Sequence, residues 1–83
     1  MPRNELLVFR ILNTLRRWRA HPLEERSLLA EIARMPDTEY NVEIVRAHIH
    51  VMLLQGLLKQ VAIGEQRQAY TLDWAGYDYL ESQ

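Results

Sequence analysis

The segment that begins at Gly56 constrains the fold of this chain more than any other. Glycine ends a helical pattern there, because it readily takes the left-handed conformation that satisfies the last helical carbonyls. Residues 57–63 have the apolar and β-branched composition of a strand, and residues 64–67 form a short polar turn. Residues 68–72 predict a second strand. The order helix, glycine, strand, turn and strand predicts a β-hairpin packed against the preceding helices.

Two amphipathic segments open the chain. Residues 4–20 carry apolar side chains at helical spacing, with Asn4 as the N-cap, and they end where Pro22 disfavours further helix. Residues 23–34 predict a shorter second helix, whose acidic first turn suits the helix dipole. The sequence also allows a short strand near Leu23, which would complete a three-stranded sheet.

A third and a fourth helix complete the expected elements. Residues 41–55 predict the third, capped by Thr38 or Asn41, and residues 74–81 predict the fourth. Gly76 lowers helix propensity, which indicates close backbone packing at that position. The residues expected to face the core are Leu7, Val8, Ile11, Leu12, Leu15, Trp18, Leu28, Leu29, Ile32, Met35, Val42, Val45, Ile49, Met52, Leu53, Trp74, Tyr77, Tyr79 and Leu80.

Together these elements predict one domain over residues 1–83 with a mostly helical α+β fold. The order α-α-α-β-β-α is that of a winged helix-turn-helix. A chain of 83 residues with 48% apolar content can build one small core, and it has no cysteine for disulfides or thiolate metal sites. No apolar run approaches the roughly 20 residues of a membrane span, and no signal peptide opens the chain. A cytoplasmic location is therefore expected.

Three segments of the sequence resemble a known family. Residues 47–58, AHIHVMLLQGLL, are similar to a helix end of the pattern YH-x-x-LL-x-x-AGL followed by an apolar residue. Residues 72–80, LDWAGYDYL, are similar to a closing signature L-T-W-A-G-H-[DE]-F-L, and residues 4–12, NELLVFRIL, look like the opening helix. The chain thus resembles a family of small winged-helix proteins of bacteria and prophages that carry a domain of unknown function.

Two positions depart from the closing signature of that family. Asp73 stands in place of threonine, and either residue can cap a helix. Tyr77 stands in place of histidine, so no role of that histidine is carried over to this chain. The resemblance implies a winged-helix fold and a regulatory role, and it implies no established activity.

A winged helix-turn-helix that binds DNA lays its third helix in the major groove, and its hairpin turn is the wing. Arginine can recognise guanine there, and glutamate can accept from the amino group of cytosine. First-helix arginines would touch the DNA backbone. An ordinary solvated helix face and an exposed turn would carry similar residues. The predicted contact residues are Asn41, Glu43, Arg46, Ala47, His50, Lys59 and Arg67.

The overall charge opposes nucleic-acid binding. Ten Lys and Arg stand against eleven Asp and Glu, for a net charge of -1, whereas neutralising phosphates supplies most non-specific DNA affinity. Arginines are concentrated in the first twenty residues, so a local positive face can still form. We predict a transcriptional regulator that binds double-stranded DNA as a homodimer. The alternative is a protein-interaction module that does not bind DNA.

Self-association is expected through Leu6, Phe9 and Tyr79. Leu6 and Phe9 lie off the main apolar stripe of the first helix, and Tyr79 lies on the last helix. The alternative interpretation of Leu6 and Phe9 is that they are scattered surface residues, which are common in monomeric proteins.

Catalysis, cofactors and metal binding are not expected. The sequence has no nucleophile next to a base and no glycine-rich phosphate loop. His48 and His50 are two positions apart and point to different faces of one helix, and no cysteine completes a ligand set. His48 lies at the edge of the buried stripe, where we expect its ring to donate to a backbone carbonyl.

Overall fold

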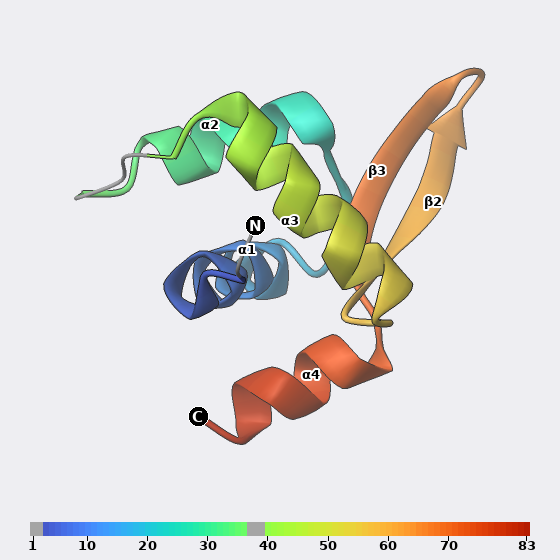
Figure 1. The fold of residues 1–83 in the computed structure, drawn as a ribbon. Coiled ribbons are helices and arrows are strands. Elements are labelled where there is room, and N and C mark those ends of the chain that lie inside the picture. The colour runs from blue at the N-terminus through green and yellow to red at the C-terminus, as the bar shows by residue number, and fades with distance from the viewer. Residues whose placement is uncertain (1–2, 37–39) are drawn as a thin grey trace.

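The computed structural model describes residues 3–36 and 40–83 of the chain (Figure 1). The fold is α+β and mostly helical, and α1 is central because it contacts α2, α3 and α4. The β2–β3 hairpin projects beyond the helices (Figure 1). This layout is compatible with a winged helix. The elements are α1 (Glu5–Arg17), β1 (Leu23–Glu24), α2 (Glu25–Ala33), α3 (Val42–Leu54), β2 (Leu58–Gly64), β3 (Arg67–Leu72) and α4 (Trp74–Glu81).

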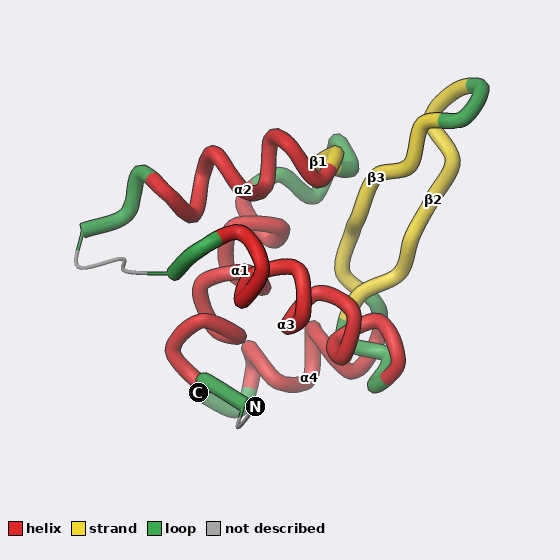
Figure 2. Tube along the Cα trace, turned by 45° about the horizontal axis from the view of Figure 1, so that its top comes forward, coloured by secondary structure: helices red, strands yellow, loops and turns green. Residues whose placement is uncertain are grey.

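The short strand that the sequence allows near Leu23 is present. β1 pairs antiparallel with β3, where Leu23 lies opposite Tyr70, and β3 pairs antiparallel with β2. The sheet therefore has the order β1-β3-β2, with β1 and β2 at its two edges (Figure 2). No described strand lies beyond β2.

Two helices are shorter than the sequence predicts. α1 ends at Arg17, because Trp18 leaves the helical conformation and begins the turn that returns the chain to the sheet. α2 begins at Glu25, because Glu24 is in β1, where it pairs with Ala69. Pairing with β3 thus overrides the helical pattern of residues 23–24.

Polar caps and one glycine fix the helix ends. The side chains of Asn4, Asn41 and Asp73 each accept a hydrogen bond from a backbone N–H in the first turn that follows, at 3.0, 2.8 and 2.8 Å. Thr38, the other predicted cap of the third helix, lies outside the described residues. Gly56 has φ of 74°, the left-handed conformation predicted for it.

The β2–β3 hairpin turns through Glu65 and Gln66, and Gly64 pairs with Arg67. Gln66 has φ of 58°, so the left-handed residue of the turn is a glutamine and not the glycine at its head. The pairing register also shifts between Ala62 and Gly64.

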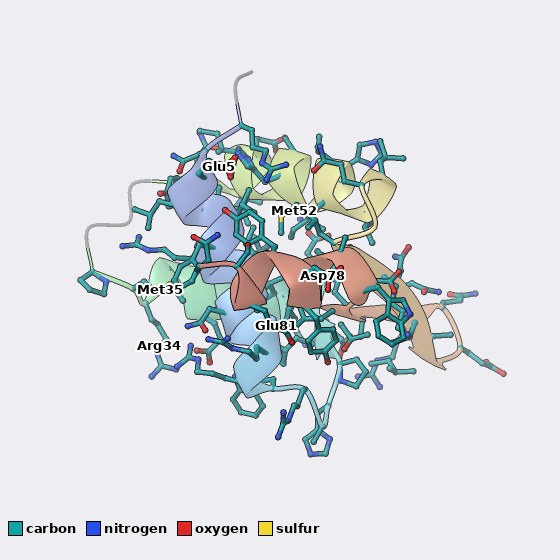
Figure 3. All side chains as sticks on the ribbon, turned by 90° about the horizontal axis from the view of Figure 1, so that it is seen from below. Glu5, Arg34, Met35, Met52, Asp78 and Glu81 are labelled. Carbon is teal, nitrogen blue, oxygen red and sulfur yellow. The ribbon has the colours of Figure 1, made fainter. Side chains whose placement is uncertain are left out.

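The core lies between the helices and the inner face of the sheet. Figure 3 shows Met52 between α3 and α4. Thr14 is a buried polar residue that the apolar pattern does not predict, and its hydroxyl donates to the Arg10 carbonyl at 2.7 Å. The core consists of Leu7, Val8, Ile11, Leu12, Leu15, Leu28, Ile32, Val45, Ile49, Met52, Leu57, Leu58, Tyr70, Leu72 and Leu80.

Three residues that the sequence places in the core are at the surface. Trp18 is 43% exposed, Val42 is 46% exposed and Trp74 is 81% exposed. Each stands at a helix end: Trp18 follows α1, and Val42 and Trp74 begin α3 and α4. The apolar stripes predict their burial wrongly because each stripe extends past the edge of the core that it covers.

The predicted close approach at Gly76 is confirmed. A Cβ at this position would lie 2.2 Å from the carbonyl oxygen of Leu57. That carbonyl also accepts a hydrogen bond from the Asp73 N–H at 3.0 Å, so the start of α4 is fixed against the segment that precedes β2. None of the helices in the described part of the chain has the length and apolar character needed to cross a bilayer.

Candidate functional site

The outward side of α3 carries most of the predicted DNA contacts. Glu43, Arg46 and His50 are exposed and Ala47 is half-buried, while Val45 and Ile49 pack inward. Asn41 precedes this surface, and its side-chain oxygen is already engaged in the cap of α3. Arg46 and His50 are therefore the exposed basic side chains among the predicted contacts on this helix.

Arg46 is not free on this surface. Its Nε donates to the carboxylate of Glu25, the first residue of α2, in an exposed ion pair. The hydrogen bond to Glu25 raises the pKa of Arg46 above its ordinary value, and the charge of the same carboxylate adds to the effect. The arginine that would recognise a base is thus held by an acid from the neighbouring helix.

Arg67 at the hairpin has the same kind of partner. Its guanidinium donates to both carboxylate oxygens of Glu24, at 2.5 and 3.4 Å. Glu24 reaches Arg67 because it pairs with Ala69, two positions away on the neighbouring strand. The hydrogen bond from Arg67 lowers the pKa of Glu24, and the same bond raises the pKa of Arg67.

Glu24 and Glu25 are adjacent acids at the junction of β1 and α2. Together they form ion pairs with both arginines that were predicted to contact DNA. The two pairs cancel in charge, and Glu43 adds a negative charge on α3. Lys59, the remaining predicted cation, is balanced by Glu43, so the predicted contacts and these two acids together have no positive surplus.

The sheet also separates the predicted contacts. Gln60 and Tyr70 lie opposite each other and line a cavity of about 300 Å³ with Arg46 and His50. Side chains of successive strand residues point to opposite faces, so Lys59, the neighbour of Gln60, lies on the other face. By the same alternation along β3, Arg67 also lies on the face opposite Tyr70. Arg46 and His50 are thus on one side of the sheet, and Lys59 and Arg67 are on the other.

The cavity beside α3 is lined by groups that already interact with one another. Burial raises the pKa of the Tyr70 hydroxyl, and the charge of Glu25 adds to this effect while Arg46 opposes it. No group of three potential metal ligands occurs within residues 3–36 and 40–83. The remaining polar lining is His50 and Gln60.

A second hollow lies on the outer side of the sheet at the base of the hairpin. It measures about 260 Å³ and is lined by Lys59, Thr71, Leu72, Asp73, Trp74 and Tyr77. Lys59 and Thr71 are paired across β2 and β3, and the indole of Trp74 is 81% exposed beside them. The apolar pattern of residues 74–81 predicts that this ring lies in the core, so an exposed tryptophan next to a hollow was not expected.

The residues predicted for self-association differ in how far they are exposed. Leu6 is 52% exposed, whereas Phe9 is half-buried and packs against the core. The Tyr79 hydroxyl donates to Glu5 at 3.1 Å, and the guanidinium carbon of Arg3 lies 5.9 Å from the centre of its ring. Burial raises the pKa of Tyr79, and the hydrogen bond to Glu5 adds to it.

His48 has the structural role that the sequence predicts. It is 4% exposed, and Nδ1 lies 2.8 Å from the carbonyl oxygen of Ile44. The backbone N–H of Asn4 donates to Nε2 at 2.9 Å, so Nε2 is the acceptor and Nδ1 carries the proton. Both ring nitrogens are thus engaged: Nε2 connects α3 to the N-cap of α1, and Nδ1 bonds a carbonyl of α3 itself.

Comparison with protein-family models, curated proteins and solved structures finds no match to this chain. The resemblance to the winged-helix family of bacteria and prophages therefore stays a prediction.

Proposed function

We propose that this chain is a winged-helix domain that acts through contact with protein and does not recognise DNA. The observation that carries the proposal is the pairing of Arg46 with Glu25 and of Arg67 with Glu24. Both arginines are among the DNA contacts that the sequence predicts.

Electrostatics supports this choice. The N-terminus of a helix usually attracts phosphate through its dipole and its free N–H groups. Here α2 begins with Glu24 as its N-cap and Glu25 as its first residue, so two carboxylates stand where a phosphate would approach. Exposed ion pairs are individually weak, typically about 0–1 kcal/mol, and phosphate could displace either acid from its arginine. The acids would nevertheless stay beside the phosphates and repel them.

Exposed apolar side chains support contact with protein. Trp74 and Leu54 are 81% and 75% exposed, and Ile63 on β2 is 39% exposed. Tryptophan is enriched in protein interfaces and among the residues that contribute most binding energy there. A solvent-exposed indole beside a hollow therefore favours a protein partner.

DNA binding is the second candidate, since the helix order suits it and Arg46 and His50 are exposed on α3. In that case α3 enters the major groove, and the affinity for DNA falls steeply as salt is added. Each phosphate that the protein neutralises contributes about -0.9 to the slope of the logarithm of the binding constant against the logarithm of the salt concentration.

The test is a titration of random duplex DNA with the native chain at several salt concentrations, followed by fluorescence anisotropy. We expect no salt-dependent binding. If binding is found, Arg46→Ala is compared with Arg19→Ala, an exposed arginine in the turn after α1. A larger loss from Arg46→Ala would establish the groove contact and overturn the proposal.

A further inference from the structure

The cavity beside α3 has the size and the construction of a small binding site. α3 and the β2–β3 hairpin flank it, and its volume of about 300 Å³ is at the lower end of the range of about 300–1,000 Å³ that small-molecule sites occupy (Figure 1). Ile49 and Tyr70 form its buried floor, at 3% and 8% exposure. Arg46, His50 and Gln60 line it as exposed side chains, so the cavity is open to solvent.

The hydroxyl of Tyr70 has no hydrogen-bond partner in this cavity. The residue interacts with Glu25 and Arg46 through their charges, and its side chain makes no hydrogen bond with residues 3–36 or 40–83. No buried side-chain oxygen in these ranges lacks a partner, so the hydroxyl reaches the open volume of the cavity. Polar groups removed from bulk water are nearly always hydrogen-bonded in proteins. A hydroxyl on a residue buried to this extent is therefore a group that a ligand can satisfy.

Gln60 supplies a second polar group beside this hydroxyl. Gln60 and Tyr70 lie opposite each other on β2 and β3, so their side chains are neighbours on one face of the sheet. The carboxamide of Gln60 makes no hydrogen bond with the described part of the chain. Because a carboxamide has donors and an acceptor side by side, it can form two parallel hydrogen bonds with an adjacent N–H and C=O of a ligand.

α3 gives the cavity an apolar wall. Ile49 and Leu53 are four positions apart, so they lie on the same face of the helix, and both line the cavity. A flat ring can pack against these two side chains while one of its edges meets Gln60 and Tyr70. The cavity thus combines one apolar wall with one hydrogen-bonding wall.

The ion pair of Arg46 with Glu25 favours an uncharged ligand. Both residues line the cavity, and their charges cancel. An anion that approaches Arg46 also meets the carboxylate of Glu25, and a cation that approaches Glu25 also meets the guanidinium of Arg46. An uncharged molecule leaves the pair intact.

We propose that the cavity between α3 and the β2–β3 hairpin binds a small, uncharged cyclic amide. The N–H of the ligand donates to the Gln60 side-chain oxygen. Its carbonyl oxygen accepts from the Gln60 amide and the Tyr70 hydroxyl, and its ring packs against Ile49 and Leu53. The inference goes beyond the proposed function and does not rest on it, because the exposed Trp74 lies beside the other hollow, on the opposite face of the sheet.

The probe that tests this site is carbostyril, an uncharged bicyclic amide. Its titration into the isotope-labelled native chain, followed by heteronuclear NMR, should shift the backbone signals of Leu53, Gln60 and Tyr70 to saturation. Two related molecules are the controls: N-methylcarbostyril lacks the N–H donor, and quinaldate carries a negative charge. We expect both to bind about fivefold more weakly or worse, because the first loses a hydrogen bond and the second meets the carboxylate of Glu25.

Two variants test the contacts to the ligand. Tyr70→Phe removes the hydroxyl and keeps the ring, and Gln60→Met replaces an exposed carboxamide with an apolar side chain of similar length. Each should weaken carbostyril binding by about fivefold or more, the change expected when a hydrogen bond is lost. The matched controls are Tyr77→Phe, at the other hollow, and Gln68→Met, at an exposed position of β3 outside the cavity lining. Neither control should change the affinity.

The inference is overturned if the native chain shows no saturable shifts, or if either folded variant binds carbostyril as tightly as the native chain does. Equal affinity for N-methylcarbostyril, or tighter binding of quinaldate, overturns it as well. Circular dichroism establishes that each variant is folded, and Gln60→Met changes an exposed residue, so it tests the site even where Tyr70→Phe unfolds. These samples contain no nucleic acid, so their outcome is independent of the duplex titration that tests the proposed function.

Discussion

Asn4 and His48 are joined by a hydrogen bond of 2.9 Å from the backbone N–H of Asn4 to Nε2 of His48. The two residues are 44 positions apart, and the bond connects the N-cap of α1 to the middle of α3. Because Nδ1 of the same ring bonds the Ile44 carbonyl, one buried imidazole satisfies a donor on one helix and an acceptor on the other.

Replacing this imidazole should destabilise the fold. We expect His48→Ala to lower the free energy of unfolding by about 1–3 kcal/mol, because the Asn4 N–H and the Ile44 carbonyl lose their partner. His50→Ala is the matched control on the same helix. Because the ring of His50 is exposed, this variant should change the free energy of unfolding by less than about 0.5 kcal/mol. Urea unfolding measures both variants. Equal losses of stability in the two variants would contradict the structural role of His48.

Gly76 should not tolerate a side chain. Alanine normally favours a helix over glycine by about 1 kcal/mol, but here its Cβ would meet the Leu57 carbonyl oxygen at 2.2 Å. We expect Gly76→Ala to destabilise the chain by about 1–3 kcal/mol, the usual cost of overpacking.

Gly64→Ala is the control for the Gly76 prediction. Its added Cβ would lie 3.8 Å from the nearest atom, Cδ of Arg67, and Gly64 has no positive φ. Thermal unfolding should therefore show little change for Gly64→Ala and a lower midpoint for Gly76→Ala. A Gly76→Ala protein as stable as the native chain would contradict the close approach of α4 to Leu57.

The caps, the glycines and His48 are predictable from sequence because their signals are local. Asn4, Asn41 and Asp73 stand directly before apolar helical patterns, and Gly56 stands directly after one. A cap bonds residues within its own turn, so its partner follows from its position. His48 likewise bonds the carbonyl four residues earlier on its own helix.

The ion pairs of the candidate site are not predictable in this way. Glu25 and Arg46 are 21 positions apart, and Glu24 and Arg67 are 43 apart. The acidic start of α2 has a sufficient local explanation in the helix dipole, so the sequence offers no reason to seek a distant arginine for it. The apolar pattern of the last helix also predicts that Trp74 is buried, because a periodic stripe does not show where the core beneath it ends.

Asn41 should contribute to stability through its cap. Its side-chain oxygen accepts from the Ile44 N–H at 2.8 Å, so we expect Asn41→Ala to lower the free energy of unfolding by about 0.5–2 kcal/mol. Asn41→Asp keeps an oxygen in the same place and should retain most of that stability. Chemical denaturation measures the free energy of unfolding of both variants. A loss of stability in Asn41→Asp as large as that in Asn41→Ala would contradict the capping role of Asn41.

Tyr79 should make stability fall at alkaline pH. Burial and the hydrogen bond to Glu5 raise its pKa in the folded chain above the ordinary value of 10.0. The unfolded tyrosine therefore ionises first, so its contribution is complete below about pH 10 and is lost as the pH rises through the folded pKa. Tyr79→Phe should show a shallower decline of the free energy of unfolding above that pH. An unchanged slope would contradict this assignment.

The most direct test of the account is to remove the two acids at the start of α2. Glu24→Gln with Glu25→Gln releases Arg67 and Arg46 and changes the net charge from -1 to +1, since two negative charges are lost. In a low-salt anisotropy titration with random duplex DNA, we predict that the native chain does not bind and that the double variant gains binding that salt abolishes. Native binding as tight as that of the double variant would contradict the claim that Glu24 and Glu25 keep this surface from DNA.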